Sequence, residues 1–202
     1  MEKIALINGS PRAPKSNSAK YLEIFKKYYA AEFIEYQVTS RKHKEFCQRL
    51  SECDKIVFAF PLYADGIPVT LMDFLKVLES EPLPKKPIVN LLINCGFFEP
   101  EQNLTAVSMM KLFCSQNGFS FGTTLCIGSG EAVLETPFSF LVERKIRKAA
   151  ENMKQGTQSL LKVTMPLPKR VYLSASTKYW VEYGRKNGVS KEKMETMQIE
   201  GN

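Results

Sequence analysis

Short apolar runs alternate along most of the chain with segments whose apolar residues recur at helical spacing. Residues 3–8 form a nearly continuous apolar run ended by Gly9, as expected of a strand buried on both faces. Four later runs are also predicted to be strands, and they span residues 33–38, 55–60, 87–94 and 119–128. The third of them stops abruptly at Pro61.

The segments between these runs have the periodicity of amphipathic helices. In the first, Ala19, Leu22, Phe25 and Tyr29 share one helical face, and Asn17 or Ser18 can cap the start. Helices are likewise predicted over residues 44–54, 69–79 and 103–117 and in a long segment from about 138 to 153. Five strands alternating with five helices predict an α/β three-layer sandwich, with a five-stranded parallel sheet covered by helices on both faces.

The periodic pattern predicts one domain followed by an extension. Residues 1–160 are expected to form the α/β domain, and residues 161–202 a helical extension that packs on this domain or on a partner subunit. Two prolines open the extension, and Ser176 and Ser190 are plausible N-caps of two short helices.

Composition and charge exclude several classes of protein. The 202 residues are 44% hydrophobic and 24% charged, which is ordinary globular usage, and no apolar run is long enough for a signal peptide or a membrane span. A cytoplasmic protein is expected. Five cysteines without a C-x-x-C pair argue against a disulfide framework and a metal site. The net charge of +7 favours anionic small molecules, and no nucleic-acid module accompanies the basic clusters.

Three loops of unusual composition follow the first, third and fourth predicted strands. They span residues 9–18, 61–68 and 95–102. In an open parallel sheet, ligands bind outside the carboxyl ends of the strands, where the strand order reverses. With a strand order of 2-1-3-4-5, these three loops are neighbours around one crevice.

The first loop nearly matches a nucleotide-binding P-loop. Lys15 and Ser16 stand at the expected positions, but Pro14 replaces the second glycine and removes a backbone donor. No acidic residue ends the strand at 55–60, and the dinucleotide pattern G-x-G-x-x-G also fails. A single phosphate held at a helix N-terminus fits better, although a flexible turn would use similar residues. The candidate phosphate ligands are Ser10, Arg12, Ser16, Asn17 and Ser18.

The second and third loops can hold a planar heterocycle. Pro61, Leu62 and Tyr63 offer apolar walls and main-chain donors, although a Pro/Gly turn with an amphipathic tyrosine is an equal alternative. Gly96 permits close approach, and Phe97 is either a ring neighbour or a core residue. The glycine-rich turn at 127–133 is expected to be an ordinary loop before a helix rather than a border of the pocket.

Together, the segments INGSPRAPKSNS (7–18) and FPLYADGIPVTLMDFL (60–75) resemble the NAD(P)H-dependent FMN reductase and quinone reductase family, which has the flavodoxin-like fold. The likeness covers residues 1 to about 155. It implies that the first loop binds the FMN phosphate through Ser10, Arg12, Asn17 and Ser18. It also implies that two sets of residues lie on opposite sides of the flavin ring. The first set is Pro61, Leu62, Tyr63 and Ala64, and the second is Asn94, Gly96 and Phe97.

The sequence departs from the family in the helix after the second loop. Met72 stands where similar proteins have lysine, and Lys76 where they have aspartate. These positions usually serve helix packing or subunit contacts. A homodimer or higher homo-oligomer is expected from the resemblance. The two replaced residues should therefore affect the geometry of its subunit contacts more than the flavin site.

The resemblance implies an oxidoreductase in which hydride passes from NAD(P)H through FMN to a quinone, free flavin or similar small acceptor. No catalytic side chain is required, because the flavin carries the chemistry and the protein supplies binding and orientation. One alternative is a flavodoxin-type FMN carrier that docks with protein partners without using NAD(P)H. Another is a flavin-free interaction protein that has kept the fold.

Overall fold

A computed structural model describes residues 1–196 of the chain, and its centre is a parallel sheet. The sheet has six strands in the order β2-β1-β3-β4-β5-β6, and all neighbouring strands are parallel. Their bounds are β1 Lys3–Asn8, β2 Glu32–Gln37, β3 Lys55–Pro61, β4 Ile88–Asn94, β5 Phe121–Ile127 and β6 Leu160–Val163. The predicted α/β class and the order of the first five strands are confirmed.

The sixth strand is a correction to the sequence-based prediction. β6 has four residues, of which only Val163 is buried, so it lacks the continuous apolar run that marked the other strands. It pairs with β5 at the edge of the sheet, where Thr124 lies opposite Leu160. An edge strand needs to bury only part of its surface, and it therefore leaves a weak hydrophobic signal.

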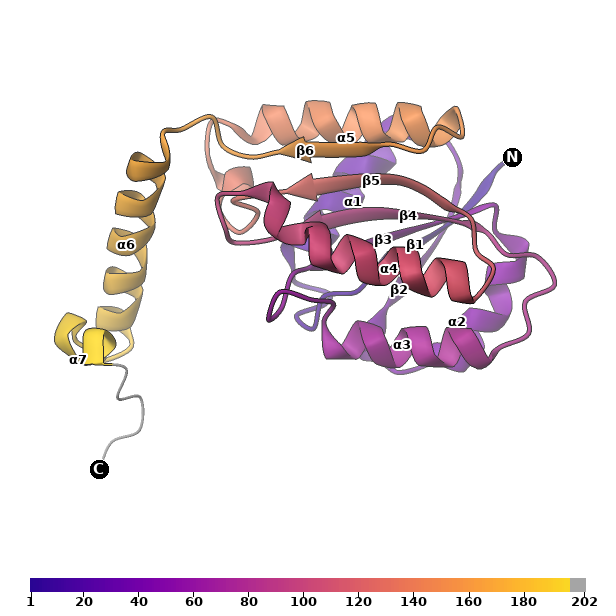
Figure 1. Ribbon diagram of the computed structural model, residues 1–202, viewed down its shortest axis with the longest axis horizontal. Helices are drawn as coiled ribbons and strands as arrows, with labels where there is room; N and C mark the ends of the chain where they lie inside the picture. The colour runs from indigo at the N-terminus through magenta and orange to yellow at the C-terminus, as the bar shows by residue number, and fades with distance from the viewer. Residues whose placement is uncertain (197–202) are drawn as a thin grey trace. The chain divides into compact units, whose positions relative to one another are not determined.

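Helices cover both faces of the sheet, as predicted (Figure 1). Helix α1 (Asn17–Tyr28) packs with α5 (Ser139–Lys154) on one face. The other face carries α2 (His43–Arg49), α3 (Val69–Ser80) and α4 (Leu104–Gln116), which share one apolar core that includes Phe46, Phe74 and Met110. Short 3-10 turns adjoin these elements at Val38–Ser40, Leu50–Glu52, Pro100–Asn103 and Val133–Glu135. The predicted three-layer sandwich is present.

A close approach at the end of β1 explains why the chain has a glycine there. A Cβ atom at Gly9 would lie 2.8 Å from Leu71 Cδ2 and 3.0 Å from Phe60 Cβ. Because real Cβ atoms do not approach so closely, only glycine lets the chain leave β1 next to β3 and α3. The first loop therefore begins at a fixed point.

The chain divides into two compact units after Met165, five residues beyond the end of the expected domain. The second unit contains α6 (Lys169–Lys186) and α7 (Lys191–Thr196). Ser190 precedes α7, and its Oγ accepts a hydrogen bond from the Lys193 amide at 3.3 Å, as expected for an N-cap. Residues 197–202 of the expected extension lie outside the described residues. Its packing on the domain or on a partner subunit stays a prediction.

Ser176 does not cap a helix. It lies inside α6, which begins directly after Pro168 and has 18 residues rather than the short length expected. Proline sets a backbone angle that suits a helix start, and nothing in the next two turns interrupts the helix. Within residues 1–196, no helix combines the length and apolar character needed to cross a membrane.

Candidate functional site

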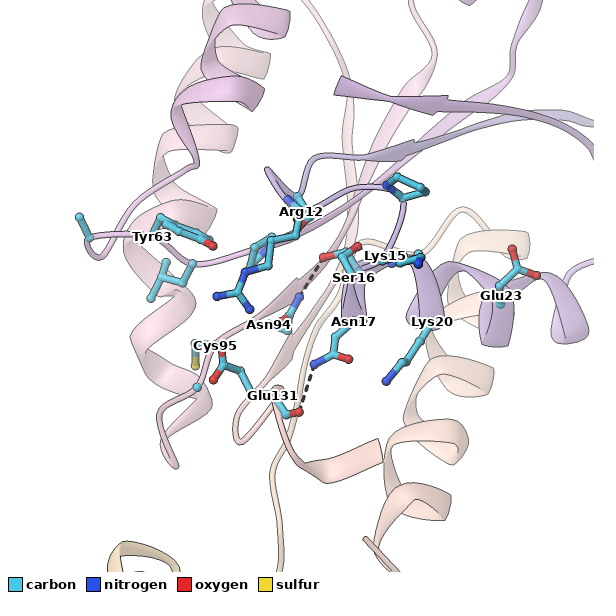
Figure 2. A pocket seen from close by; sticks show the side chains of 18 residues that line it. Arg12, Lys15, Ser16, Asn17, Lys20, Glu23, Tyr63, Asn94, Cys95 and Glu131 are labelled. Carbon is cyan, nitrogen blue, oxygen red and sulfur yellow. Dashed lines mark hydrogen bonds between the residues drawn. The ribbon is translucent and has the colours of Figure 1, made fainter. Parts of the chain in front are cut away.

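A cavity of about 760 Å³ lies at the carboxyl ends of β1, β3 and β4 (Figure 2). The structure brings to its wall eleven of the twelve residues that the sequence singled out. They are Ser10, Arg12, Ser16, Asn17, Ser18, Pro61, Leu62, Tyr63, Ala64, Asn94 and Gly96. The twelfth, Phe97, does not line the cavity, and its surface is 52% exposed. The three loops thus meet around one hollow.

Loop 9–18 is held by hydrogen bonds from both of its ends. The Ser10 amide donates to Asn8 Oδ1 at 3.1 Å, and the Arg12 amide donates to Ser10 Oγ at 3.2 Å. The N-cap of α1 is Ser16, whose Oγ accepts from the Ala19 amide at 3.2 Å, so the expected cap at Asn17 or Ser18 was wrong by one or two residues. These bonds fix both ends of the loop relative to the start of α1.

Positive charge and backbone donors gather at this end of the cavity. The amides of Asn17 and Ser18 begin α1, so they have no partner within the helix, and no other acceptor for them is found in residues 1–196. The side chains of Arg12, Lys15 and Lys20 line the same cavity, and an anionic group at a helix N-terminus needs such positive charge (Figure 2).

Two of the predicted phosphate ligands use their side chains to join loops. Asn94 Nδ2 donates to Ser18 Oγ at 3.3 Å and to the Phe60 carbonyl at 3.1 Å. Asn17 Nδ2 donates to the carbonyls of Gly130 and Glu131 at 3.0 and 3.1 Å. At position 17, donation to a bound anion therefore falls to the backbone amide, whereas the Ser18 hydroxyl, which only accepts from Asn94, keeps its own proton to donate.

The opposite wall is a tight turn between Tyr63 and Gly66. The Tyr63 amide donates to the Gly66 carbonyl at 3.1 Å, and the Gly66 amide returns the bond at 2.9 Å. Ala64 and Asp65 between them have φ values of 44° and 57°, the left-handed conformation of a type I′ turn. The turn presents the Tyr63 side chain, which is 43% exposed, to the cavity.

The fold of the first compact unit is similar to that of several solved structures. No protein-family model matches the sequence, and no curated protein matches it. The FMN-dependent NADH-azoreductase from Bacillus anthracis str. Ames Ancestor, solved in complex with FMN, is 14% identical, with a TM-score of 0.56 over 76% of this chain and 99% of that chain. The NAD(P)H:quinone oxidoreductase from Methanothermobacter marburgensis is 14% identical, with a TM-score of 0.61 over 75% and 96%. The Streptococcus pneumonia TIGR4 flavodoxin is 18% identical, with a TM-score of 0.55 over 75% and 98%.

The domain has the flavodoxin-like fold. Within this fold, the cavity lies at the carboxyl ends of β1 and β3, the neighbouring strands between which the strand order reverses. The fold thus places the three predicted loops together, as expected from the resemblance.

The turn after β5 is a part of the site that the sequence analysis missed. It was expected to be an ordinary loop, but Glu131 lines the cavity, so that expectation was wrong. The Gly130 carbonyl accepts from Asn17 Nδ2 and from the Tyr21 hydroxyl at 2.8 Å. The buried Tyr21 hydroxyl stays neutral, because burial strongly raises its pKa. These contacts join positions more than a hundred residues apart, and no local motif reveals them.

The remaining wall comes from residues that stand beside predicted ones. They are Pro14, Lys15, Ala19, Lys20, Glu23 and Cys95. Cys95 is buried, and burial raises its pKa to about 11, so its thiol stays protonated at neutral pH. All five cysteines are buried and unpaired with one another, and residues 1–196 contain no cluster of three metal-ligating side chains. The described cavity wall therefore combines cationic side chains and backbone donors with an apolar turn.

Proposed function

We propose that this protein is an FMN-dependent oxidoreductase that passes hydride from NAD(P)H through FMN to a quinone, free flavin or similar small acceptor. The observation that carries the proposal is a single cavity that joins a cationic helix N-terminus to an apolar turn. Structures with the same fold include an azoreductase described as FMN-dependent and an enzyme described as an NAD(P)H:quinone oxidoreductase.

The residues of the cavity fit FMN at both of its ends. Arg12 and the amides of Asn17 and Ser18 would hold the phosphate, which needs donors and positive charge. Pro61, Leu62 and Tyr63 would cover the ring on one side, with Gly96 and Asn94 on the other. A volume of about 760 Å³ lies within the range of known cofactor sites.

The protein's own contribution would be binding and orientation. When bound, FMN supplies the capacity to accept and return a hydride, so no acid or base from the chain is needed. Cys95 does not add a redox-active thiolate, because its pKa of about 11 keeps the thiol protonated at neutral pH. Tyr63 is the exposed side chain at the ring end, and it would limit how a second substrate approaches.

An electron carrier of the flavodoxin type is the second candidate, because the pneumococcal flavodoxin has the same fold. Charge favours the enzyme. The chain carries 28 Lys and Arg against 21 Asp and Glu, and three cationic side chains line the cavity against two acidic ones. Such a surface attracts an anionic dinucleotide. We expect a small-molecule acceptor, a homodimer or higher homo-oligomer, and a cytoplasmic location.

One experiment separates the candidates. The purified protein is mixed with FMN, freed of excess flavin and scanned for flavin absorbance, and NADPH and NADH oxidation is then followed with a simple quinone. A flavin spectrum with turnover supports the proposal. A flavin spectrum without turnover identifies a carrier. A protein that takes up no flavin and oxidises neither nucleotide contradicts both.

A further inference from the structure

A second cavity, of about 650 Å³, adjoins the first across the turn that contains Tyr63 and Ala64. Both residues line both cavities, so the turn is a shared wall. The second cavity continues between the start of α3, at Val69 and Thr70, and Met109 of α4. It therefore opens beside the ring end of the first cavity, on the face of the sheet that α3 and α4 cover.

The two cavities differ in chemistry. The first has five charged side chains on its wall, three cationic and two acidic, whereas Asp65 is the one charged side chain among the described residues that line the second. The rest of the second lining is mainly carbon, and Val69 is 72% exposed there. Removing apolar surface from water is favourable, and a cavity without cations does not attract phosphates. Its chemistry fits an uncharged apolar group.

A few polar atoms border this apolar surface. The Thr70 hydroxyl is buried and has no hydrogen-bond partner in the described part of the chain. The amides of Val69 and Thr70 begin α3 and likewise find no acceptor within residues 1–196. An oxygen acceptor on an otherwise apolar ligand would suit this end of the cavity, as an ether or carbonyl oxygen does.

We propose that the second cavity binds the apolar substituent of the electron acceptor, while the acceptor's redox-active ring lies beside the flavin at the ring end of the first cavity. This inference rests on the proposed function and narrows its substrate class to amphipathic acceptors, such as quinones that carry an alkyl chain. The shared wall at Tyr63 and Ala64 puts the two cavities next to each other, so one molecule can reach both.

The test compares two quinones that have the same ring, one with and one without a ten-carbon alkyl chain. The FMN-loaded protein is assayed with NADPH, and kcat/KM is measured for each quinone. Burial of about three methylene groups would favour the alkylated quinone roughly fiftyfold. Equal values for the two quinones would overturn the inference.

The Gly66→Leu variant places bulk in the second cavity. A Cβ at Gly66 would lie 3.5 Å from Met109 Sδ, an ordinary contact, so the backbone tolerates a side chain that points toward the cavity. We expect the preference for the alkylated quinone to fall at least tenfold. In the matched control, Leu112→Gln alters an exposed apolar residue of α4 outside the cavity, and the preference stays. An unchanged preference in Gly66→Leu would contradict the inference.

Two further measurements keep the failures distinct. The flavin spectrum of each variant shows whether FMN is still bound, and calorimetry measures quinone binding without turnover. Tail-dependent binding to a protein that does not oxidise NAD(P)H would overturn the proposed function and leave the apolar site standing. NADPH oxidation together with quinone binding that does not depend on the alkyl chain would overturn the apolar site and leave the proposed function standing. A self-associated protein whose contact surface covers Val69 and Met109 would assign the cavity to a second copy of the chain and overturn the inference.

Discussion

The two loops on opposite sides of the first cavity are held in different ways. Loop 9–18 is tied to Asn8, Asn94 and Gly130 by side-chain hydrogen bonds, and Ser10 and Ser18 within it are buried. The turn at 63–66 depends on one pair of backbone bonds, and Tyr63, Ala64 and Asp65 are exposed. The proposed phosphate end is therefore preorganised, whereas we expect the proposed ring end to adjust to different ligands.

The largest effect that we expect concerns Cys95. This residue lies on the anchored side of the cavity, the side where hydrogen bonds hold loop 9–18. Its pKa of about 11 means that about one thiol in a thousand is ionised at pH 8, so alkylation by iodoacetamide should be on the order of a hundredfold slower than for an ordinary thiol. The rate is measured by mass spectrometry of the peptide that contains Cys95. The urea-unfolded protein is the control, and rapid modification in the native state would show that the anchored side opens.

Gly130→Val should break the anchored side. A Cβ there would lie 2.8 Å from Asn94 Cβ and 3.2 Å from the Cys95 carbonyl oxygen. Overpacking of this kind lowers the free energy of unfolding by about 1–3 kcal/mol, and FMN affinity should fall with it. Urea unfolding and flavin titration measure the two effects. Gly66→Ala is the matched control, because its Cβ makes only an ordinary contact with Met109. Equal free energies of unfolding in the two variants would contradict the claim that close packing at Gly130 holds the anchored side in place.

Ala64→Gly tests the strained turn, and its effect is smaller. Ala64 has a φ of 44°, a left-handed conformation that glycine adopts without strain. We expect the free energy of unfolding to rise by up to about 1 kcal/mol. The same replacement at Ala132, where φ is −113°, should lower it by roughly 0.5–1 kcal/mol. A loss of stability in both variants would contradict the backbone assignment of the turn.

Much of this picture could be predicted from the sequence because it depends on local signals. The apolar run that ends at Gly9 and the helical spacing after residue 17 mark the strand, loop and helix of the proposed phosphate end, although the cap is Ser16 rather than Asn17 or Ser18. The proline at residue 61 and the glycine at 66 mark the ring end. Two such loops, placed at the carboxyl ends of neighbouring strands, meet without any further information.

Other features depend on contacts that no local pattern records. Glu131 reaches the cavity because Asn17 and Tyr21 hold the turn after β5. Phe97 follows Gly96 directly, yet its side chain leaves the cavity, and a single aromatic residue in a loop does not indicate its direction. β6 is too short and too exposed to be recognised, and Ser176 resembles a cap although the helix around it is continuous.

The central claim is that loop 9–18 is a phosphate cradle, and comparing FMN with riboflavin tests it directly because the two differ only in the phosphate. We predict that the protein binds FMN more tightly than riboflavin and that Arg12→Ala removes most of this difference. A charge-assisted hydrogen bond contributes about 1.5–3 kcal/mol, which corresponds to a tenfold to hundredfold loss. Lys27→Ala, at the far end of α1, removes the same charge and should keep the preference. Equal affinity for FMN and riboflavin in the unaltered protein would contradict the account.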